Sequence, residues 1–154
     1  MREILLDIPF CHQKTDSACC GPCCIKMLLD FYGIKKSNGK EYTKQSLIAL
    51  AKTDKEYGTQ FRAMNSLLRL VELSRVKLQN EKEDIMLALE SGHPVLTVIP
   101  DQDADHYVVI RGFTKNEYIL ADPYYGISRT VKESVMHKMI QEGGRWVWEI
   151  YAKS

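Results

Sequence analysis

Apolar residues recur at helical spacing directly after a cluster of cysteines near the N-terminus. Cys24, Leu28 and Phe31 stand at positions i, i+4 and i+7, so they share one face of a helix. Pro22 suits the first turn, where its missing N–H costs no hydrogen bond, and Gly33 is a common stop residue. The pattern predicts a buried, central helix that begins at a cysteine and ends at Gly33.

Three more segments carry the apolar stripe of a helix packed against a core. Thr43 is a good N-cap for a short helix through residue 51, an amphipathic stripe covers residues 60–73, and a further helix covers residues 82–90. The pattern over residues 131–141 predicts one more helix or an irregular crossing. Residues 34–42 have the composition of an exposed loop.

After residue 94 the apolar residues no longer follow helical spacing and instead form runs typical of strands. Four β-branched and aromatic runs, separated by turn-like stretches, predict strands at residues 95–99, 106–113, 117–122 and 145–151. Shorter extended segments are predicted at residues 4–10 and 76–78. Because helices come first and strands afterwards, we expect an α+β fold in which N-terminal helices pack on a C-terminal antiparallel sheet, within a single domain of residues 1–154.

Charge and composition argue against several classes of function. The 154 residues carry 21 basic and 20 acidic side chains and a formal net charge of +1, so no field exists that would attract nucleic acid or an anionic membrane. The apolar runs fall short of the about eighteen residues of a membrane span, and the N-terminus does not resemble a signal peptide. Five cysteines, all between residues 11 and 24, favour a reducing compartment, and we expect a cytoplasmic protein.

A cysteine at the start of a helix is a candidate nucleophile. The unpaired N–H groups and the positive end of the helix dipole favour a thiolate over a thiol there. Gln13 lies upstream on the same loop, so its side-chain amide can donate to the oxygen of a carbonyl that the thiolate attacks. The alternative is that the cysteine serves only as a small packing residue.

One of the four histidines stands where a catalytic base is expected. His106 opens a predicted strand, which is a rigid position from which a ring can face a cleft, whereas His12 is expected to face solvent, and His93 and His137 to lie at the surface. Asp122 ends the following strand, so a hairpin brings it close to His106, where a carboxylate would orient the ring. An Asp before a Pro is also a common turn residue.

Five motifs in order resemble one known family. They are Gln13 with Cys20-Gly21, Phe-Tyr-Gly33, Gly92-His-Pro-Val-Leu, His106-Tyr-Val-Val and Asp122-Pro-Tyr-Tyr-Gly. Across roughly residues 5–130 the chain resembles the bacteriocin-processing leader peptidases, papain-clan cysteine peptidases that cut after double-glycine leaders. The resemblance implies a papain-like fold with its cleft between helix and sheet, Cys20 as nucleophile, His106 as general base and acid, Asp122 as orienting carboxylate and Gln13 as oxyanion donor.

The chain departs from the family pattern next to the nucleophile. Many members have an acid directly before the reactive cysteine and an alanine soon after it, but here Cys19 precedes Cys20 and Pro22 follows Gly21. Cys19 therefore remains an alternative nucleophile. The exporter's membrane and ATPase domains, to which many such peptidases are fused, are not in the sequence, so we expect a stand-alone member, and a leader-peptide substrate rests on analogy.

We expect a cysteine peptidase that cleaves a peptide or protein substrate through a thioester and needs no cofactor. Acyl transfer or deamidation by the same triad stays open, because any nucleophile that reaches a thioester can resolve it. A peptide-binding module without activity is a second alternative. A zinc site built on Cys20 and Cys23 is a third, although the sequence supplies no cysteine beyond Cys24 to complete it.

Overall fold

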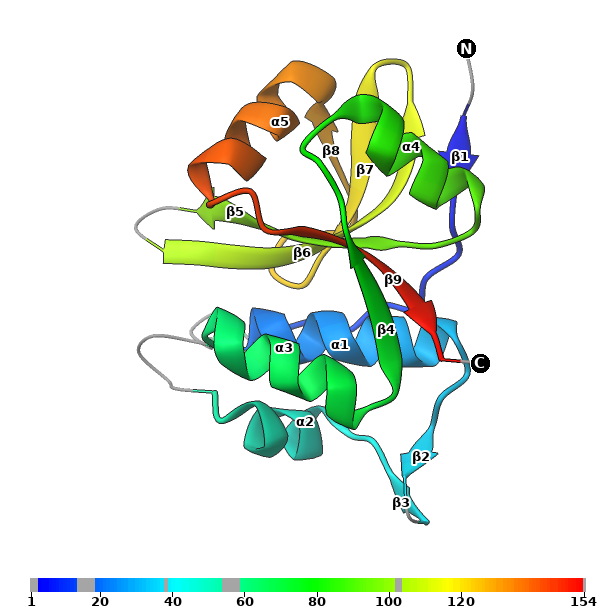
Figure 1. Ribbon diagram of the computed structural model, residues 1–154, viewed down its shortest axis with the longest axis vertical. Helices are drawn as coiled ribbons and strands as arrows, with labels where there is room; N and C mark the ends of the chain where they lie inside the picture. Colours follow the sequence, from blue (N-terminus) through cyan, green and yellow to red (C-terminus); the bar gives the residue numbers. More distant parts are fainter. Residues whose placement is uncertain (1–2, 14–18, 38, 54–58, 102–103, 154) are drawn as a thin grey trace.

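An antiparallel sheet runs through the middle of the computed structural model, with helices on both of its faces (Figure 1). The structure describes residues 3–13, 19–37, 39–53, 59–101 and 104–153. Its helices are α1 (Cys20–Phe31), α2 (Lys44–Ala51), α3 (Phe61–Leu70), α4 (Lys82–Glu90) and α5 (Glu133–Glu142). Among these described helices none is long and apolar enough to cross a bilayer.

The main sheet has the strand order β4-β9-β5-β6-β7-β8, and β1 pairs with the far end of β6. All of these pairs are antiparallel. The strands are β1 (Ile4–Leu5), β4 (Leu73–Lys77), β5 (Val95–Asp101), β6 (Ala104–Thr114), β7 (Glu117–Asp122), β8 (Gly126–Lys132) and β9 (Val147–Ala152). The predicted α+β fold with an antiparallel sheet is confirmed.

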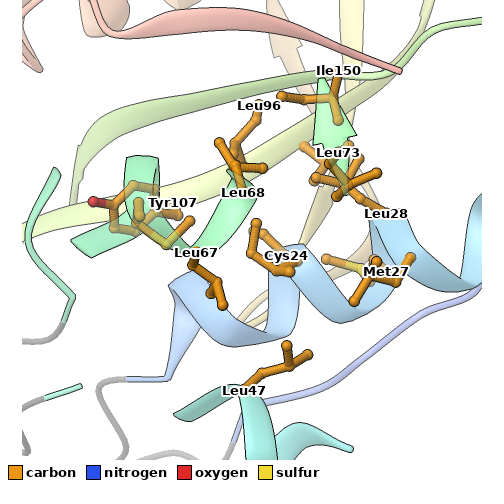
Figure 2. Close-up of a cluster of buried hydrophobic side chains, with 14 of the residues drawn as sticks. Cys24, Met27, Leu28, Leu47, Leu67, Leu68, Leu73, Leu96, Tyr107 and Ile150 are labelled. Atoms are coloured by element: carbon orange, nitrogen blue, oxygen red, sulfur yellow. The ribbon is translucent and has the colours of Figure 1, made fainter. Parts of the chain in front are cut away.

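Apolar side chains of the central strands point toward both faces of the sheet. On β5, Leu96 and Val98 join the core formed with α1, α2 and α3, whereas Val95 and Ile99 join the core formed with α4 and α5. A strand buried on both faces is apolar throughout rather than alternating, which is why this stretch of sequence reads as one continuous run. Figure 2 shows the first core, where Cys24 and Leu28 of α1 lie between Leu47 of α2 and the sheet.

The cysteine helix packs on the sheet, as predicted from its apolar face. Its first turn packs closely on α3, because a Cβ atom at Gly21 would lie 3.0 Å from the sulfur of Met64 and 3.2 Å from Cβ of Thr59. Glycine at this position lets the helix start approach its neighbour. The helix α2 also begins as predicted, since Thr43 accepts from the N–H of Ser46 and forms a capping box.

Two element boundaries predicted from the sequence between residues 60 and 78 were wrong. The helix α3 ends at Leu70, not at residue 73, because Glu72 adopts a left-handed conformation with φ 64° and turns the chain. Leu73 then pairs with Ala152, so β4 begins three residues before the predicted strand. Long-range pairing with β9 overrides the local helical pattern here.

Other boundaries differ at the ends of the chain and in its last third. Regular pairing in the predicted first strand is limited to Ile4–Leu5, and the predicted loop at residues 34–42 contains the short strands β2 (Lys36–Ser37) and β3 (Lys40–Glu41). The strand β8 was not predicted, and its last two residues, 131 and 132, fall in the stretch predicted as a helix or an irregular crossing, whereas α5 begins at Glu133. The last strand starts at residue 147, because Arg145 has a φ of 59°.

The hairpin of β6 and β7 forms as predicted. Thr114 pairs with Glu117 across a turn in which Lys115 and Asn116 both have positive φ, 49° and 67°. Two such residues are typical of the tight turn that matches the twist of a hairpin. The turn joins the two strands, and a bulge between Ile110 and Gly112 then shifts their register by one residue. The start of β6 and the end of β7 come together, where His106 contacts Asp122.

Candidate active site

The Cys20 side chain lies at the start of α1 and is 8% exposed. Cys19 is the N-cap residue, and its carbonyl accepts the N–H of Cys23 at 3.0 Å. The first N–H groups of a helix have no partners within the helix, so this end is electropositive. The sulfur of Cys20 therefore sits at a position that stabilises negative charge.

His106 lies near the start of β6 and is joined to Asp122 at the end of β7. The ring nitrogen Nε2 lies 2.6 Å from Oδ1 of Asp122, and the two residues are 6% and 0% exposed. Because Nε2 is engaged by the carboxylate, the other ring nitrogen, Nδ1, is left for the Cys20 thiol. The structure thus brings together three of the four predicted site residues.

The surroundings of His106 favour its charged form. Burial alone would lower its pKa, but the hydrogen bonds to Asp122 and to Cys20, together with the negative charges of both partners, raise the pKa to about 9. An imidazolium is therefore present at neutral pH, as an ion pair with a thiolate requires.

Both carboxylate oxygens of Asp122 are engaged. In addition to His106, Oδ1 accepts the backbone N–H groups of Tyr124 and Tyr125 at 2.9 and 3.2 Å. The other oxygen, Oδ2, lies 2.7 Å from Nη1 of Arg129. Burial alone would raise the pKa of Asp122, but the bonds from His106, Arg129 and Tyr124 lower it below its ordinary value. The carboxylate is ionised, and the turn-residue alternative holds as well, since the same oxygen caps the turn.

Gln13, the fourth predicted residue, is 5% exposed and lies beside the end of β7. Its backbone N–H donates to the carbonyl oxygen of Pro123 at 2.9 Å, directly after Asp122 in the chain. Lys44 donates to the carbonyl oxygen of the preceding residue, His12, at 2.8 Å. The segment before the cysteine helix is thus tied to the sheet and to α2. Residues 14–18, the rest of the predicted loop to Cys19, lie outside the described residues.

The remaining cysteines have other neighbours. Cys11 and Cys23 share a hydrogen bond, which lowers the pKa of Cys11 to about 7 and raises that of Cys23. Cys24 is fully buried in the core, and burial raises its pKa. Within the part of the chain that the structure describes, no group of three or more His, Cys, Asp and Glu side chains is placed to hold a metal ion.

Two of the other histidines are less exposed than predicted. His93 is half-buried, with Nδ1 2.7 Å from Oε2 of Glu149. His137 is also half-buried, and its two ring nitrogens lie 2.8 and 2.7 Å from Asn80 Oδ1 and Tyr118 Oη. Both residues keep part of their surface exposed, and each ring bonds a polar partner from another element.

A comparison with protein families identifies this architecture. The sequence matches the Peptidase C39 family over residues 8–139. The chain belongs to the Peptidase C39 family. The resemblance seen in the five motifs is therefore confirmed, and the match spans the segments that carry Gln13, Cys20, His106 and Asp122. A search of curated proteins found no match.

Solved structures share the fold of this C39-family chain. A C39-like peptidase from Bacillus anthracis is 15% identical with a TM-score of 0.77, and all of both chains is covered. A double glycine motif protease from an AMS/PCAT transporter, solved in complex with the leader peptide, is 14% identical with a TM-score of 0.72, covering 100% of this chain and 99% of that one. The peptidase domain of Streptococcus ComA is 18% identical with a TM-score of 0.66, covering 94% and 98%.

One residue that contacts this site was missed by sequence reasoning. Arg129 of β8 binds Asp122, but the strand that carries it was not predicted. A signal was present, since Ile127, Arg129 and Val131 alternate with polar residues as in a half-buried strand. Its pairing with Asp122, by contrast, depends on how β7 and β8 are aligned.

Proposed function

We propose that this chain is a cysteine peptidase in which Cys20 is the nucleophile, His106 the general base and acid, Asp122 the orienting carboxylate and Gln13 an oxyanion donor. The observation that carries the proposal is the connected series of contacts from Cys20 through His106 to Asp122. Membership of a peptidase family supports it.

Peptide cleavage would begin with attack by the Cys20 thiolate on the carbonyl carbon of the scissile bond. A C–S bond forms, and the carbonyl oxygen takes the negative charge, to which Gln13 and the first N–H groups of α1 can donate. When the C–N bond breaks, His106 gives its proton to the departing amine. The products of this half-reaction are a free amine and a thioester on Cys20.

Water would then resolve the thioester. Neutral His106 takes a proton from water, the oxygen attacks the thioester carbonyl, and the C–S bond breaks. The acid product leaves, and the thiolate and imidazolium are restored. Asp122 holds the ring in one orientation and offsets its positive charge throughout, without taking the proton itself.

For the substrate we propose a peptide with a leader segment that ends in two small residues. A structural neighbour with a TM-score of 0.72 is a double glycine motif protease that was solved with its leader peptide. The near-neutral charge of this chain, +1, gives no reason to favour a strongly acidic or basic substrate. The same fold with Gly21 directly after the cysteine supports this class of peptidase.

Product mass spectrometry tests the proposal. A set of synthetic peptides with Gly-Gly, Gly-Ala and larger pairs before the scissile bond is incubated with the wild type, Cys20→Ala and Cys19→Ala in ¹⁸O-enriched water. We expect cleavage after the small pair by the wild type and by Cys19→Ala, with ¹⁸O in the new carboxyl group, and no product with Cys20→Ala.

Other products would lead to different conclusions. Equal processing by Cys20→Ala, or loss of processing in Cys19→Ala with Cys20 intact, would overturn the assignment of the nucleophile. Acyl products formed with an added amine in preference to ¹⁸O-labelled acid would indicate acyl transfer. A gain of about three mass units without chain cleavage, which corresponds to replacement of an amide NH2 by ¹⁸OH, would indicate deamidation. Binding without turnover by the wild type and by every variant would indicate a peptide-binding module without activity.

A further inference from the structure

The residues that face Asp122 from β8 are set by an irregularity in strand pairing. Asp122 pairs with Gly126 and Leu120 with Arg129, so between these pairs one residue of β7 opposes two of β8. In an unbroken ladder Ser128 would be the residue opposite Leu120. The extra residue is a β-bulge, which commonly re-aims a side chain beside a functional site. Here it directs Arg129 toward Asp122.

Arg129 completes the coordination of a carboxylate that has no exposed surface. Its Nη1 lies 2.7 Å from Oδ2 of Asp122, and the opposite oxygen, Oδ1, takes the ring of His106 and two backbone N–H groups. With donors on both oxygens the carboxylate cannot turn about its last bond without breaking one of these contacts. Its orientation toward His106 is therefore fixed by β8 as well as by the turn.

Arg129 is itself held from the solvent side. The guanidinium carbon lies 4.6 Å from the centre of the Tyr125 ring, and the hydroxyl of Tyr125 donates to Oδ1 of Asp101 at 3.0 Å. The Arg129 side chain is 27% exposed. A cation stacked on an aromatic ring and bonded to a buried carboxylate has few other positions. These contacts link β5, β8 and the turn after β7 around one charged group.

The charges around His106 explain what this arginine would do for the site. Two acidic groups contact the ring, Cys20 from α1 and Asp122 from β7, and the ring of Tyr125 lies edge-on at 6.4 Å. Asp101 lies beyond Tyr125 on β5, and Asp105 precedes His106 on β6. Arg129 is the cation that offsets Asp122, so it limits how strongly His106 holds its proton.

We propose that Arg129 is a positioning residue of this site, which fixes the Asp122 carboxylate toward the His106 ring and shares its negative charge. The inference rests on the proposed function for its effect on turnover. Its effect on His106 is independent of turnover, because the charge of Arg129 acts on Asp122 whether or not substrate is present. Arg129 would act only through Asp122 and would not touch the reacting atoms.

The test combines a histidine titration with kinetics. The ring signals of ¹⁵N-histidine-labelled protein are followed from pH 5 to pH 11, with His106 assigned through His106→Gln. In Arg129→Met, with the cation lost, we expect the His106 midpoint to rise by about 0.5 to 1 pH unit. We expect kcat to fall about tenfold with KM changed less than twofold, because an orienting contact is lost and no substrate contact.

Two variants separate the charge from the loss of a large side chain. Arg129→Lys keeps a cation, so its His106 midpoint should stay within about 0.3 unit of the wild type and its kcat should lie between those of the wild type and Arg129→Met. Lys132→Met removes an exposed cation from the same strand and should change neither quantity. If Arg129→Met does not fold, the midpoint in Arg129→Lys and its partial loss of kcat decide the question.

The proposal is overturned if folded Arg129→Met keeps the wild-type His106 midpoint and kcat, if Arg129→Lys shifts the midpoint upward, or if Lys132→Met has the same effects. Should the wild type cleave no peptide, the proposed function fails, and the His106 titration alone still decides whether Arg129 acts through Asp122. The two failures are therefore distinguishable.

Discussion

His106 Nε2 and Asp122 Oδ1 lie 2.6 Å apart, and both side chains are almost completely buried. The bond assigns the two ring nitrogens to different partners, because a ring that offers Nε2 to the carboxylate has Nδ1 available for the sulfur of Cys20. It also fixes the plane of the ring. The chemistry proposed for this site depends on that division of roles.

The first prediction concerns the pH dependence of peptide cleavage. Acylation needs the protonated ring, and the pKa of His106 is raised to about 9, so kcat/KM should be lost as the pH rises through about 9 and not near the ordinary histidine value. A plot of initial rates between pH 5 and pH 10.5, measured with a cleaved peptide, gives the position of this alkaline limb.

The matched control for this profile is Asp122→Asn. The amide keeps the size of the side chain but removes the negative charge that stabilises the imidazolium, so the alkaline limb should move to lower pH. Turnover should fall by about 10² to 10⁴, as expected for a ring that loses its orienting carboxylate. An alkaline limb that stays at the same pH in Asp122→Asn would show that it reports another group.

A second prediction concerns Gln13. Its backbone bond to Pro123 does not depend on the side chain, so Gln13→Ala should keep the fold and lose only the donor proposed for the oxyanion. We expect kcat to fall by about 10² to 10³, which is typical for one such donor, with little change in KM. Gln13→Glu, which has the same shape without the N–H group, should lose as much.

Thermal melts of both Gln13 variants provide the control. If the melting temperature falls together with activity, the side chain serves packing and the role in catalysis is wrong. A retained melting temperature with full activity would assign the oxyanion to other donors, such as the first N–H groups of α1.

A third prediction is a second reactive thiol at Cys11. Hydrogen bonding from Cys23 lowers the pKa of Cys11 to about 7, against the effect of its partial burial, and Lys44 and Lys26 add to the lowering. A group with a lowered pKa is ionised above that value, so in Cys20→Ala protein Cys11 should be alkylated by iodoacetamide with a midpoint near pH 7. Peptide mapping after timed alkylation locates the label.

Substitution of the donor tests the cause of this reactivity. Cys23→Ala in the same background removes the hydrogen bond and should move the alkylation midpoint of Cys11 upward by about one unit. Cys23→Ser keeps a donor and should leave the midpoint closer to that of the parent. An unchanged midpoint in Cys23→Ala would mean that the lysines, and not Cys23, activate Cys11.

The fourth prediction concerns the contact of β1 with β6. Leu5 pairs with Gly112, and a Cβ atom at residue 112 would overlap the carbonyl oxygen of Ile4. Gly112→Ala should therefore lower the free energy of unfolding by about 1 to 3 kcal/mol, as overpacking does, which a denaturant titration measures. In a chain shortened by residues 1–5 the clash is absent, so the same substitution should cost clearly less there.

Much of the site could be predicted because its parts are local in sequence. The helix that begins at Cys20 follows from an apolar stripe with Pro22 and Gly33 at its ends. His106 and Asp122 belong to one hairpin, which the turn at Lys115 and Asn116 closes, although a bulge between Ile110 and Gly112 sets the register beyond the turn. Turn chemistry and periodicity decide such features within a few residues.

Contacts that join distant segments could not be predicted in this way. The end of α3 is set at Leu70 because Leu73 pairs with β9, about eighty residues later, and local helical preference is weaker than a ladder of hydrogen bonds. Arg129 reaches Asp122 only because a bulge shifts β8 by one residue. A one-residue shift reverses the face of every following side chain, and no local pattern records it.

The sequence by itself determined the helix that begins at Cys20, the hairpin that carries His106 and Asp122, and the class of fold, because each follows from short-range spacing of apolar, turn and capping residues. Only the tertiary structure decided that the sheet is covered on both faces, that Cys11 meets Cys23, and that Arg129 binds Asp122. These contacts arise where separate elements pack together, and packing is a property of the whole chain rather than of any one segment.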